Sequence, residues 1–115
     1  MGLILFYPSP IFEKEDVMSE EFNQKLEKWI VEYSEKDEAA KNWSQKFYGA
    51  GFTSFGSNQT LHKNEPLFQE LAKGLIPSIK EFFQELKAVE PKEIYCVGMW
   101  CSINKPKSMH PRHIH

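Results

Sequence analysis

The run from Ile94 to Ile103, Ile-Tyr-Cys-Val-Gly-Met-Trp-Cys-Ser-Ile, is the feature that most limits what this chain can fold into. Its apolar residues do not alternate with polar ones, so an extended strand made from it is apolar on both faces. Gly98 in the middle indicates a bulge or a close approach of another backbone. The sequence therefore predicts a buried strand that is covered by a layer of structure on each side.

Two segments before this run repeat apolar residues at helical spacing and are expected to form amphipathic helices. The first is expected to begin at Ser19, whose hydroxyl can cap the helix, with Glu20 and Glu21 in the favourable first turn. The charge-rich segment 34–46 that follows is either a helical continuation or a solvated connection, and charge alone leaves both readings open. The apolar stripe of the first helix consists of Phe22, Leu26, Trp29, Ile30 and Tyr33.

The second helical segment is expected to be capped by Asn64, with Pro66 in its first turn. Pro77 lies inside the pattern and predicts a kink or a break into two helices. Pro91 marks the end of the segment. An apolar stripe of this kind is typical of a core-facing helix face, and it consists of Leu67, Phe68, Leu71, Leu75, Ile79, Phe82 and Leu86.

The remaining segments are predicted from turn residues. The apolar run Leu3–Tyr7 ends at Pro8 and is expected to be an edge strand. The glycines of residues 49–56 favour turns around a short Phe/Thr/Ser strand, because the pattern of a nucleotide-binding loop is incomplete. The chain is thus expected to be one domain, residues 1–115, in the order strand, helix, loop or strand, helix, long strand, turn and strand.

Composition narrows the class of protein. The chain has 115 residues, 41% hydrophobic content and a net charge of −2, which is ordinary for one globular domain and gives no reason to expect nucleic acid or a membrane surface as partner. No apolar run is as long as a membrane span, and the N-terminal stretch lacks the features of a signal peptide. Cys96 and Cys101 are an odd number of residues apart, so on a strand they point to opposite faces and are expected to be free, buried thiols. A cytoplasmic location is therefore expected.

The last six residues, His-Pro-Arg-His-Ile-His, contain three of the four histidines. In an extended segment His113 and His115 point to the same side, and two neutral imidazoles can begin a transition-metal site. Further ligands could come from His62, His110 or the two cysteines, but none has a diagnostic spacing. A metal-binding pair and a solvated surface tail both remain open on these residues alone.

The span from Trp100 to His115 resembles the start of the catalytic core in a group of small 2-oxoglutarate- and iron(II)-dependent oxygenases. The group's segment is similar to Trp-x-Asn-x-x-x-x-Gly-x-x-x-x-x-His-x-His, and the interval from Trp100 to His113 and His115 fits it. Ser102 stands where the group has Asn, and Lys107 stands where it has Gly. The upstream stretches "LFYPSPIF", "FTSFGSNQTL" and "LFQELAKGL" also resemble the N-terminal half of this group.

This resemblance implies an α+β fold in which helices of residues 15–90 pack on the first strands of a double-stranded β-helix, a jelly-roll or cupin-like fold. Residues 92–115 would begin that β core, which is truncated after them. The implied cofactors are Fe(II) and 2-oxoglutarate, with His113 and His115 as metal ligands. The distal histidine and the basic residue that binds 2-oxoglutarate are expected in later strands, so the 115-residue chain is expected to be an inactive fragment of a dioxygenase. The residues expected beside the ligands or the substrate are Trp100, Ser102, Asn104 and His110.

Two other classes of function stay open. One is a small non-enzymatic α+β module whose histidine tail is solvated. The other is a metal-binding or assembly domain that completes its site with a second copy across a two-fold axis. In the oxygenase reading the partner is a small-molecule co-substrate, with no nucleic acid and no membrane. An exposed sheet edge also predicts a homo-oligomer.

Overall fold

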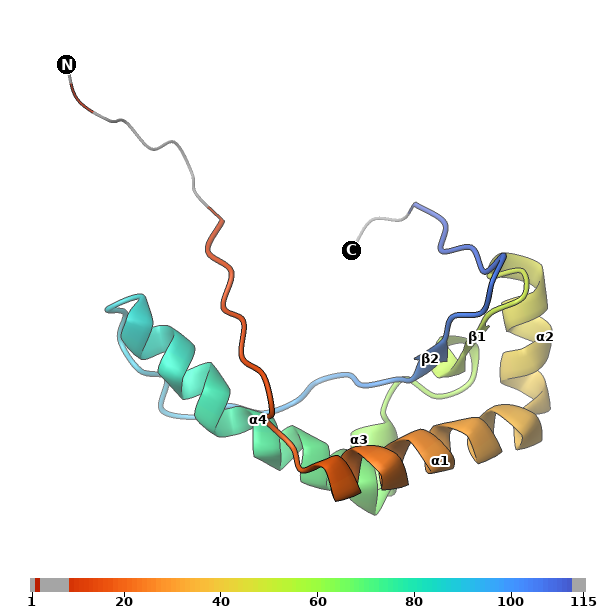
Figure 1. The fold of residues 1–115 in the computed structure, drawn as a ribbon, viewed down its shortest axis with the longest axis horizontal. Coiled ribbons are helices and arrows are strands. Elements are labelled where there is room, and N and C mark those ends of the chain that lie inside the picture. Colours follow the sequence, from red (N-terminus) through yellow and green to blue (C-terminus); the bar gives the residue numbers. More distant parts are fainter. Residues whose placement is uncertain (1, 3–8, 113–115) are drawn as a thin grey trace.

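The computed structural model describes residue 2 and residues 9–112, and Figure 1 shows their arrangement. The described residues form four α-helices and one two-stranded antiparallel sheet. The α+β expectation is therefore correct at this coarse level, while a sheet of two strands shows no jelly roll. The predicted strand Leu3–Tyr7 lies outside the described residues. In chain order the elements are α1 (Glu20–Lys36), α2 (Glu38–Phe47), β1 (Phe52–Thr53), the 3-10 turn η1 (Ser54–Gly56), α3 (Leu61–Asn64), α4 (Pro66–Glu85) and β2 (Ser102–Ile103).

Helix α1 begins as predicted. The Ser19 hydroxyl accepts a hydrogen bond from the Phe22 N–H at 3.1 Å, and Glu20 and Glu21 occupy the first turn, where the helix dipole favours acidic residues. Of the apolar stripe, only Phe22 is fully buried, and the other four residues pack at the border of the core. The periodicity thus predicted the inward face of α1 correctly.

The charge-rich segment after α1 is helical. Asp37 ends α1 and caps α2, because its carboxylate accepts a hydrogen bond from the Ala40 N–H at 2.9 Å. An aspartate at this position supplies one of the acceptors that the first turn of a helix lacks. The segment is therefore helical, as the first of the two alternatives predicted, and Asp37 divides it between two helices.

Helix α4 begins one residue later than predicted. Asn64 is the last residue of α3, Glu65 is the N-cap of α4 without a side-chain hydrogen bond, and Pro66 occupies the first turn as expected. Of the kink or break predicted at Pro77, the break is wrong, since α4 continues through this residue to Glu85. Proline removes only one hydrogen bond from the helix, and the turns on both sides of it are retained.

The predicted long strand from Ile94 to Ile103 is mostly absent from the described fold. Only Ser102 and Ile103 form a strand, and Met99 makes an isolated parallel bridge with Thr60. The side chains of Tyr95 and Val97 are 76% and 78% exposed. The prediction that both faces of this run are covered is therefore wrong, because the described residues supply a layer on one side only.

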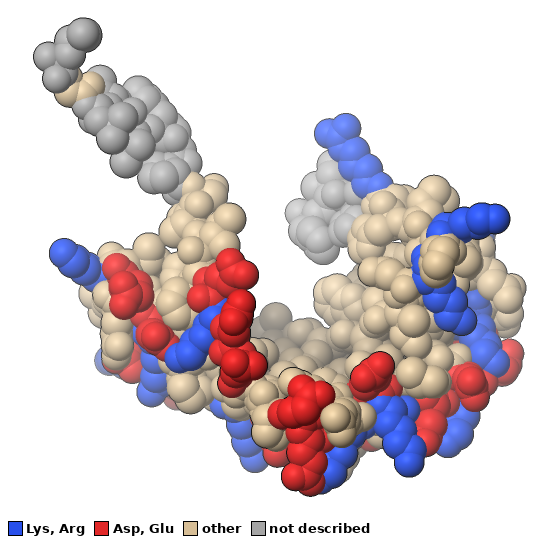
Figure 2. All heavy atoms as spheres, in the orientation of Figure 1, with Lys and Arg blue, Asp and Glu red and all other residues tan. Residues whose placement is uncertain are grey.

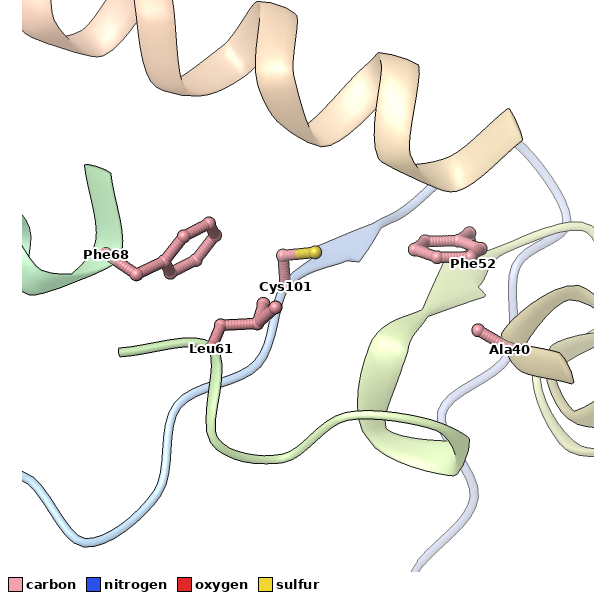
Figure 3. Packing of buried hydrophobic residues seen from close by; sticks show 5 residues of the cluster. All are labelled: Ala40, Phe52, Leu61, Phe68 and Cys101. Atoms are coloured by element: carbon pink, nitrogen blue, oxygen red, sulfur yellow. The ribbon is translucent and has the colours of Figure 1, made fainter. Parts of the chain in front are cut away.

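The core lies where α1, α4 and the small sheet meet (Figure 3). Strand β1 pairs with β2 in a register that places Phe52 opposite Ile103 and Thr53 opposite Ser102. The Trp29 ring contacts the Phe68 ring edge-on at a centroid distance of 5.1 Å and stacks on the Tyr33 ring at 4.7 Å. The Tyr33 ring in turn contacts the Phe52 ring. A row of aromatic rings thus joins α4, α1 and β1. The residues of the buried cluster are Ala40, Phe52, Leu61, Phe68 and Cys101.

The cap at Asp37 predicts a pH dependence of stability. Partial burial acts to raise the pKa of Asp37, but hydrogen bonds from the Ser57 hydroxyl, the Ala40 N–H and the Tyr33 hydroxyl outweigh it, and the pKa lies below its usual value. A carboxyl whose pKa is lowered by folding stabilises the fold above its ordinary pKa of about 4, and this contribution is lost as the pH falls through the lowered value. Asp37→Asn keeps a capping side chain without the charge. We expect it to lower the free energy of unfolding by about 1 kcal/mol at about pH 6, with a smaller difference from wild type at about pH 3.

Urea denaturation of both proteins at the two pH values checks this expectation. Glu38→Gln, which changes an exposed acid in the next position without touching the cap, is the control for general charge effects. A difference between wild type and Asp37→Asn that does not change with pH would contradict the role of the carboxylate.

Candidate functional site

Three of the predicted site residues lie on one side of the β2 segment. Trp100, Ser102 and Asn104 are exposed, whereas Cys101 is buried and Ile103 is half-buried against the core. This alternation is the two-residue period of an extended strand. The side chains of Trp100, Ser102 and Asn104 therefore point away from the core together, as the sequence motif requires of neighbours on a strand.

The backbone of the same three residues points toward a free edge of the sheet. The Cys101 carbonyl accepts a hydrogen bond from the Ser54 N–H at 2.9 Å, and the Met99 N–H donates to the Gln59 carbonyl at 2.8 Å. Neighbouring residues along a strand direct their backbone N–H and C=O groups to opposite edges of the strand. The N–H and C=O groups of Trp100, Ser102 and Asn104 thus face the other side, where no strand among residues 9–112 pairs with them. We call this row of backbone groups the β2 edge.

The opposite edge of the sheet, on β1, is closed by a side chain of α2. The Ser44 hydroxyl accepts a hydrogen bond from the Thr53 N–H at 2.9 Å and lies 3.2 Å from the Thr53 carbonyl oxygen, to which it can donate. It also lies 2.6 Å from the Ala40 carbonyl within its own helix. Ser44 and Thr53 are 1% and 0% exposed. Because a helix occupies this side, the described sheet can be extended only at the β2 edge.

A groove lies beside the β2 edge, between α1 and β2. Its apolar wall consists of Leu26, Ile30, Val31 and Ile103, and its polar residues are Asn23, Glu27, Ser102 and Asn104. A strand that paired with the β2 edge would direct every second side chain to the α1 face of the sheet, where this groove is. The arrangement can therefore bind an extended segment through its backbone and through alternate side chains.

Trp100 and His110 are the two ends of a second row of aromatic rings. Trp100 contacts Phe55 edge-on at a centroid distance of 5.2 Å, and Phe55 lies 5.7 Å from Trp43. Trp43 lies 5.5 Å from Tyr48, whose ring meets the His110 ring edge-on at 5.0 Å. The Met109 N–H also donates to the Tyr48 carbonyl at 3.0 Å, so the end of α2 holds the segment that leads toward the terminal histidines.

Site residues that are close in the predicted motif are thus linked through α2. Between the Trp100 and His110 rings, this row contains the rings of Phe55, Trp43 and Tyr48.

The proposed metal ligands His113 and His115 lie outside the described residues. Within the described residues no three His, Cys, Asp or Glu side chains are grouped so that they could hold a metal ion. Both cysteines are free, as expected; Cys101 is buried, and Cys96 is only half-buried. Burial raises the pKa of the Cys101 thiol, which disfavours the thiolate that a metal binds. The described residues alone therefore do not fit an iron centre.

His62 and Cys96 line a separate, mainly apolar groove along α4. Both ring nitrogens of His62 are buried and have no hydrogen-bond partner among the described residues, and the Cys96 thiol donates to the Gly98 carbonyl at 3.2 Å. Among the described residues, no third His, Cys, Asp or Glu is grouped with His62 and Cys96 to hold a metal ion.

Sequence reasoning missed the buried hydroxyl groups that hold the sheet. Ser54 accepts a hydrogen bond from the Cys101 N–H at 3.1 Å, and the Ser102 hydroxyl donates to the Thr53 hydroxyl at 2.9 Å. Thr53 and Ser54 lie between Phe52 and Phe55, and this polar pair between two aromatic residues was a signal that could have been used. Ser44 gave no such signal, since a serine in a helix is ordinarily solvated.

Comparisons of the chain with protein-family models, with curated proteins and with solved structures find no match. None of the helices in the part of the chain that the structure describes is long and apolar enough to cross a membrane. Figure 2 shows acidic and basic side chains interspersed along α1 and α4, while the surface around the hollow of this view is largely uncharged. On this face no large patch carries a single sign of charge.

Proposed function

We propose that this chain forms the helical support and the first strands of a 2-oxoglutarate- and iron(II)-dependent oxygenase domain. The observation that carries the proposal is the one-sided sheet. Its β1 edge is closed by Ser44, and its free β2 edge consists of residues of the oxygenase-like motif, Trp100 and Ser102. A double-stranded β-helix needs more than two strands, and the β2 edge is the place where the described sheet leaves room for them.

The proposed roles of the residues follow from this placement. His113 and His115 supply imidazole ligands to the metal, and Trp100, Ser102, Asn104 and His110 lie beside the ligands or the substrate. When bound, Fe(II) with 2-oxoglutarate would supply oxidation of a C–H bond by O2. Because the described residues do not complete a ligand set, no reaction step is assigned to them, and the 115-residue chain is proposed to be inactive by itself.

The setting of the proposed enzyme is the cytoplasm, with a small molecule as co-substrate and with neither nucleic acid nor membrane as partner. Two free cysteines support a reducing compartment. The interspersed charges of Figure 2 and the net charge of −2 support the exclusion of nucleic acid.

A second candidate is a small non-enzymatic α+β module that binds a partner through its exposed apolar residues. The observation that favours it is the exposure of Tyr95 and Val97, together with the lack of a metal-binding cluster in residues 9–112. Exposed apolar residues that lie close together often mark an interaction surface. This candidate predicts that the chain binds no metal ion specifically.

Metal titration separates the two candidates. We expect the chain to bind about one Co²⁺ ion, used as a spectroscopic substitute for Fe(II), with d–d absorption bands typical of imidazole ligands. Loss of a residue that supports a metal ligand commonly weakens metal binding about tenfold or more, and loss of the ligand itself should weaken it at least as much. We therefore expect His113→Ala and His115→Ala each to reduce the affinity for Co²⁺ about tenfold or more.

His62→Ala is the matched control, because His62 is remote from the motif in sequence and lines the groove along α4. Its affinity for Co²⁺ should equal that of wild type. If His113→Ala binds Co²⁺ as tightly as wild type, the metal ligands of the oxygenase proposal are wrong. If wild type itself binds no Co²⁺, the non-enzymatic module is the better description.

A further inference from the structure

The β2 edge presents backbone groups of three alternating residues, Trp100, Ser102 and Asn104, that pair with no strand among residues 9–112 and lie beside an apolar groove. We propose that a second copy of this chain pairs with this edge, so that two chains form a closed dimer with a continuous sheet in the order β1–β2–β2–β1. This inference concerns the 115-residue chain and does not rest on metal binding or on oxygenase activity.

The edge is complementary to itself in one antiparallel register. With the two-fold axis at Ser102, this residue faces Ser102 of the second copy, and Trp100 faces Asn104 of the second copy. The outward-pointing residues of the two chains then form three hydrogen-bonded pairs. Each such pair exchanges two backbone hydrogen bonds, so the interface has about six. A shift of the register by two residues would leave one outward residue of each chain without its partner.

Side chains also suit this register. Lys105 would lie opposite Met99 of the second copy, and the turn closed by the hydrogen bond from the Ser108 N–H to the Lys105 carbonyl ends the pairing there. No two like charges are directly opposed, which would otherwise destabilise the pairing. On the α1 face, Ile103 of the second copy would lie beside the groove wall of Leu26, Ile30 and Val31. These contacts would remove apolar surface from water, which favours association.

The closed β1 edge limits the association to two chains. Ser44 already binds the backbone N–H of Thr53, and α2 covers that side of the sheet. The described part of each chain therefore offers one sheet edge, and an isologous pairing of the β2 edges uses the edge of both copies. A dimer is expected, without growth into longer sheets.

Sedimentation velocity of the purified chain over a range of concentrations tests the inference. Wild type should sediment as a monomer–dimer equilibrium. Ser102→Pro removes the N–H that points out of the edge and should shift the chain to monomer. Ser102→Ala loses only the hydroxyl bond to Thr53 and keeps this N–H, so it should still dimerise. A monomeric wild type, or a dimeric Ser102→Pro protein, would overturn the proposal.

Hydrogen exchange keeps the test valid if Ser102→Pro does not fold. In wild type, the amides of Trp100, Ser102 and Asn104 should exchange at least about tenfold faster on dilution to the monomer, whereas those of Met99 and Cys101 should not change. Protection of the three edge amides in a monomer would mean that another part of the same chain covers the edge. A dimer in which the three edge amides are not protected would mean that the chains associate through another surface. Each of these two results would reject the β2 pairing.

Discussion

Replacement of Phe68 by alanine is expected to lower the free energy of unfolding by about 3–5 kcal/mol, the largest stability effect of any single change predicted for this chain. Phe68 is 2% exposed and lies in the buried cluster where α4, α1 and the sheet meet (Figure 3). Its ring contacts Trp29 edge-on with an interplanar angle of 70°. Alanine would remove the ring and leave a cavity, and it would end the row of aromatic contacts from α4 to β1.

The small size of the core makes this loss severe. Single domains are commonly stable by only about 5–15 kcal/mol, so one cavity can remove a large share of the stability. Urea denaturation followed by far-UV circular dichroism measures the effect. Ile79→Ala, on an exposed part of the same helix, is the control, because it changes helix propensity about as much as Phe68→Ala does. It should lower the free energy of unfolding by less than about 1 kcal/mol. Equal losses for the two variants would show that Phe68 is not the residue that joins α4 to the core.

The second helical stripe shows what periodicity can and cannot predict. All seven of its residues, from Leu67 to Leu86, were expected in the core, yet only Phe68 is fully buried and Ile79 and Leu86 are exposed. Helical spacing identifies the side of a helix that faces apolar neighbours. How far along the helix those neighbours extend depends on the rest of the fold, and α4 continues beyond the elements that cover it.

The candidate site was predictable to the extent that it follows strand geometry. Trp100, Ser102 and Asn104 share a side because residues two apart on a strand always do. The closure of the β1 edge was not predictable, because Ser44 and Thr53 are brought together only when α2 packs on the sheet. The metal ligands His113 and His115 stay a prediction, since they lie outside the described residues.

The second large effect is expected at the residue that closes this edge. Ser44→Ala should lower the free energy of unfolding by about 2–4 kcal/mol, because it leaves the buried N–H and C=O of Thr53 without their side-chain partner. Ser34→Ala is the matched control. The Ser34 hydroxyl makes the same kind of bond within α1, to the Val31 carbonyl at 2.7 Å, but in an exposed position, so its loss should change stability by less than about 0.5 kcal/mol.

Association gives Ser44→Ala a second readout. If the Ser44 hydroxyl closes the β1 edge, its removal frees backbone groups of Thr53 for pairing with another chain. Where the loss of the hydroxyl also lets α2 move away from β1, each Ser44→Ala chain has two open edges, and species larger than a dimer should appear in sedimentation velocity at concentrations where wild type stops at the dimer. A Ser44→Ala protein as stable as Ser34→Ala, with no larger species, would show that packing of α2 closes the edge without the hydroxyl.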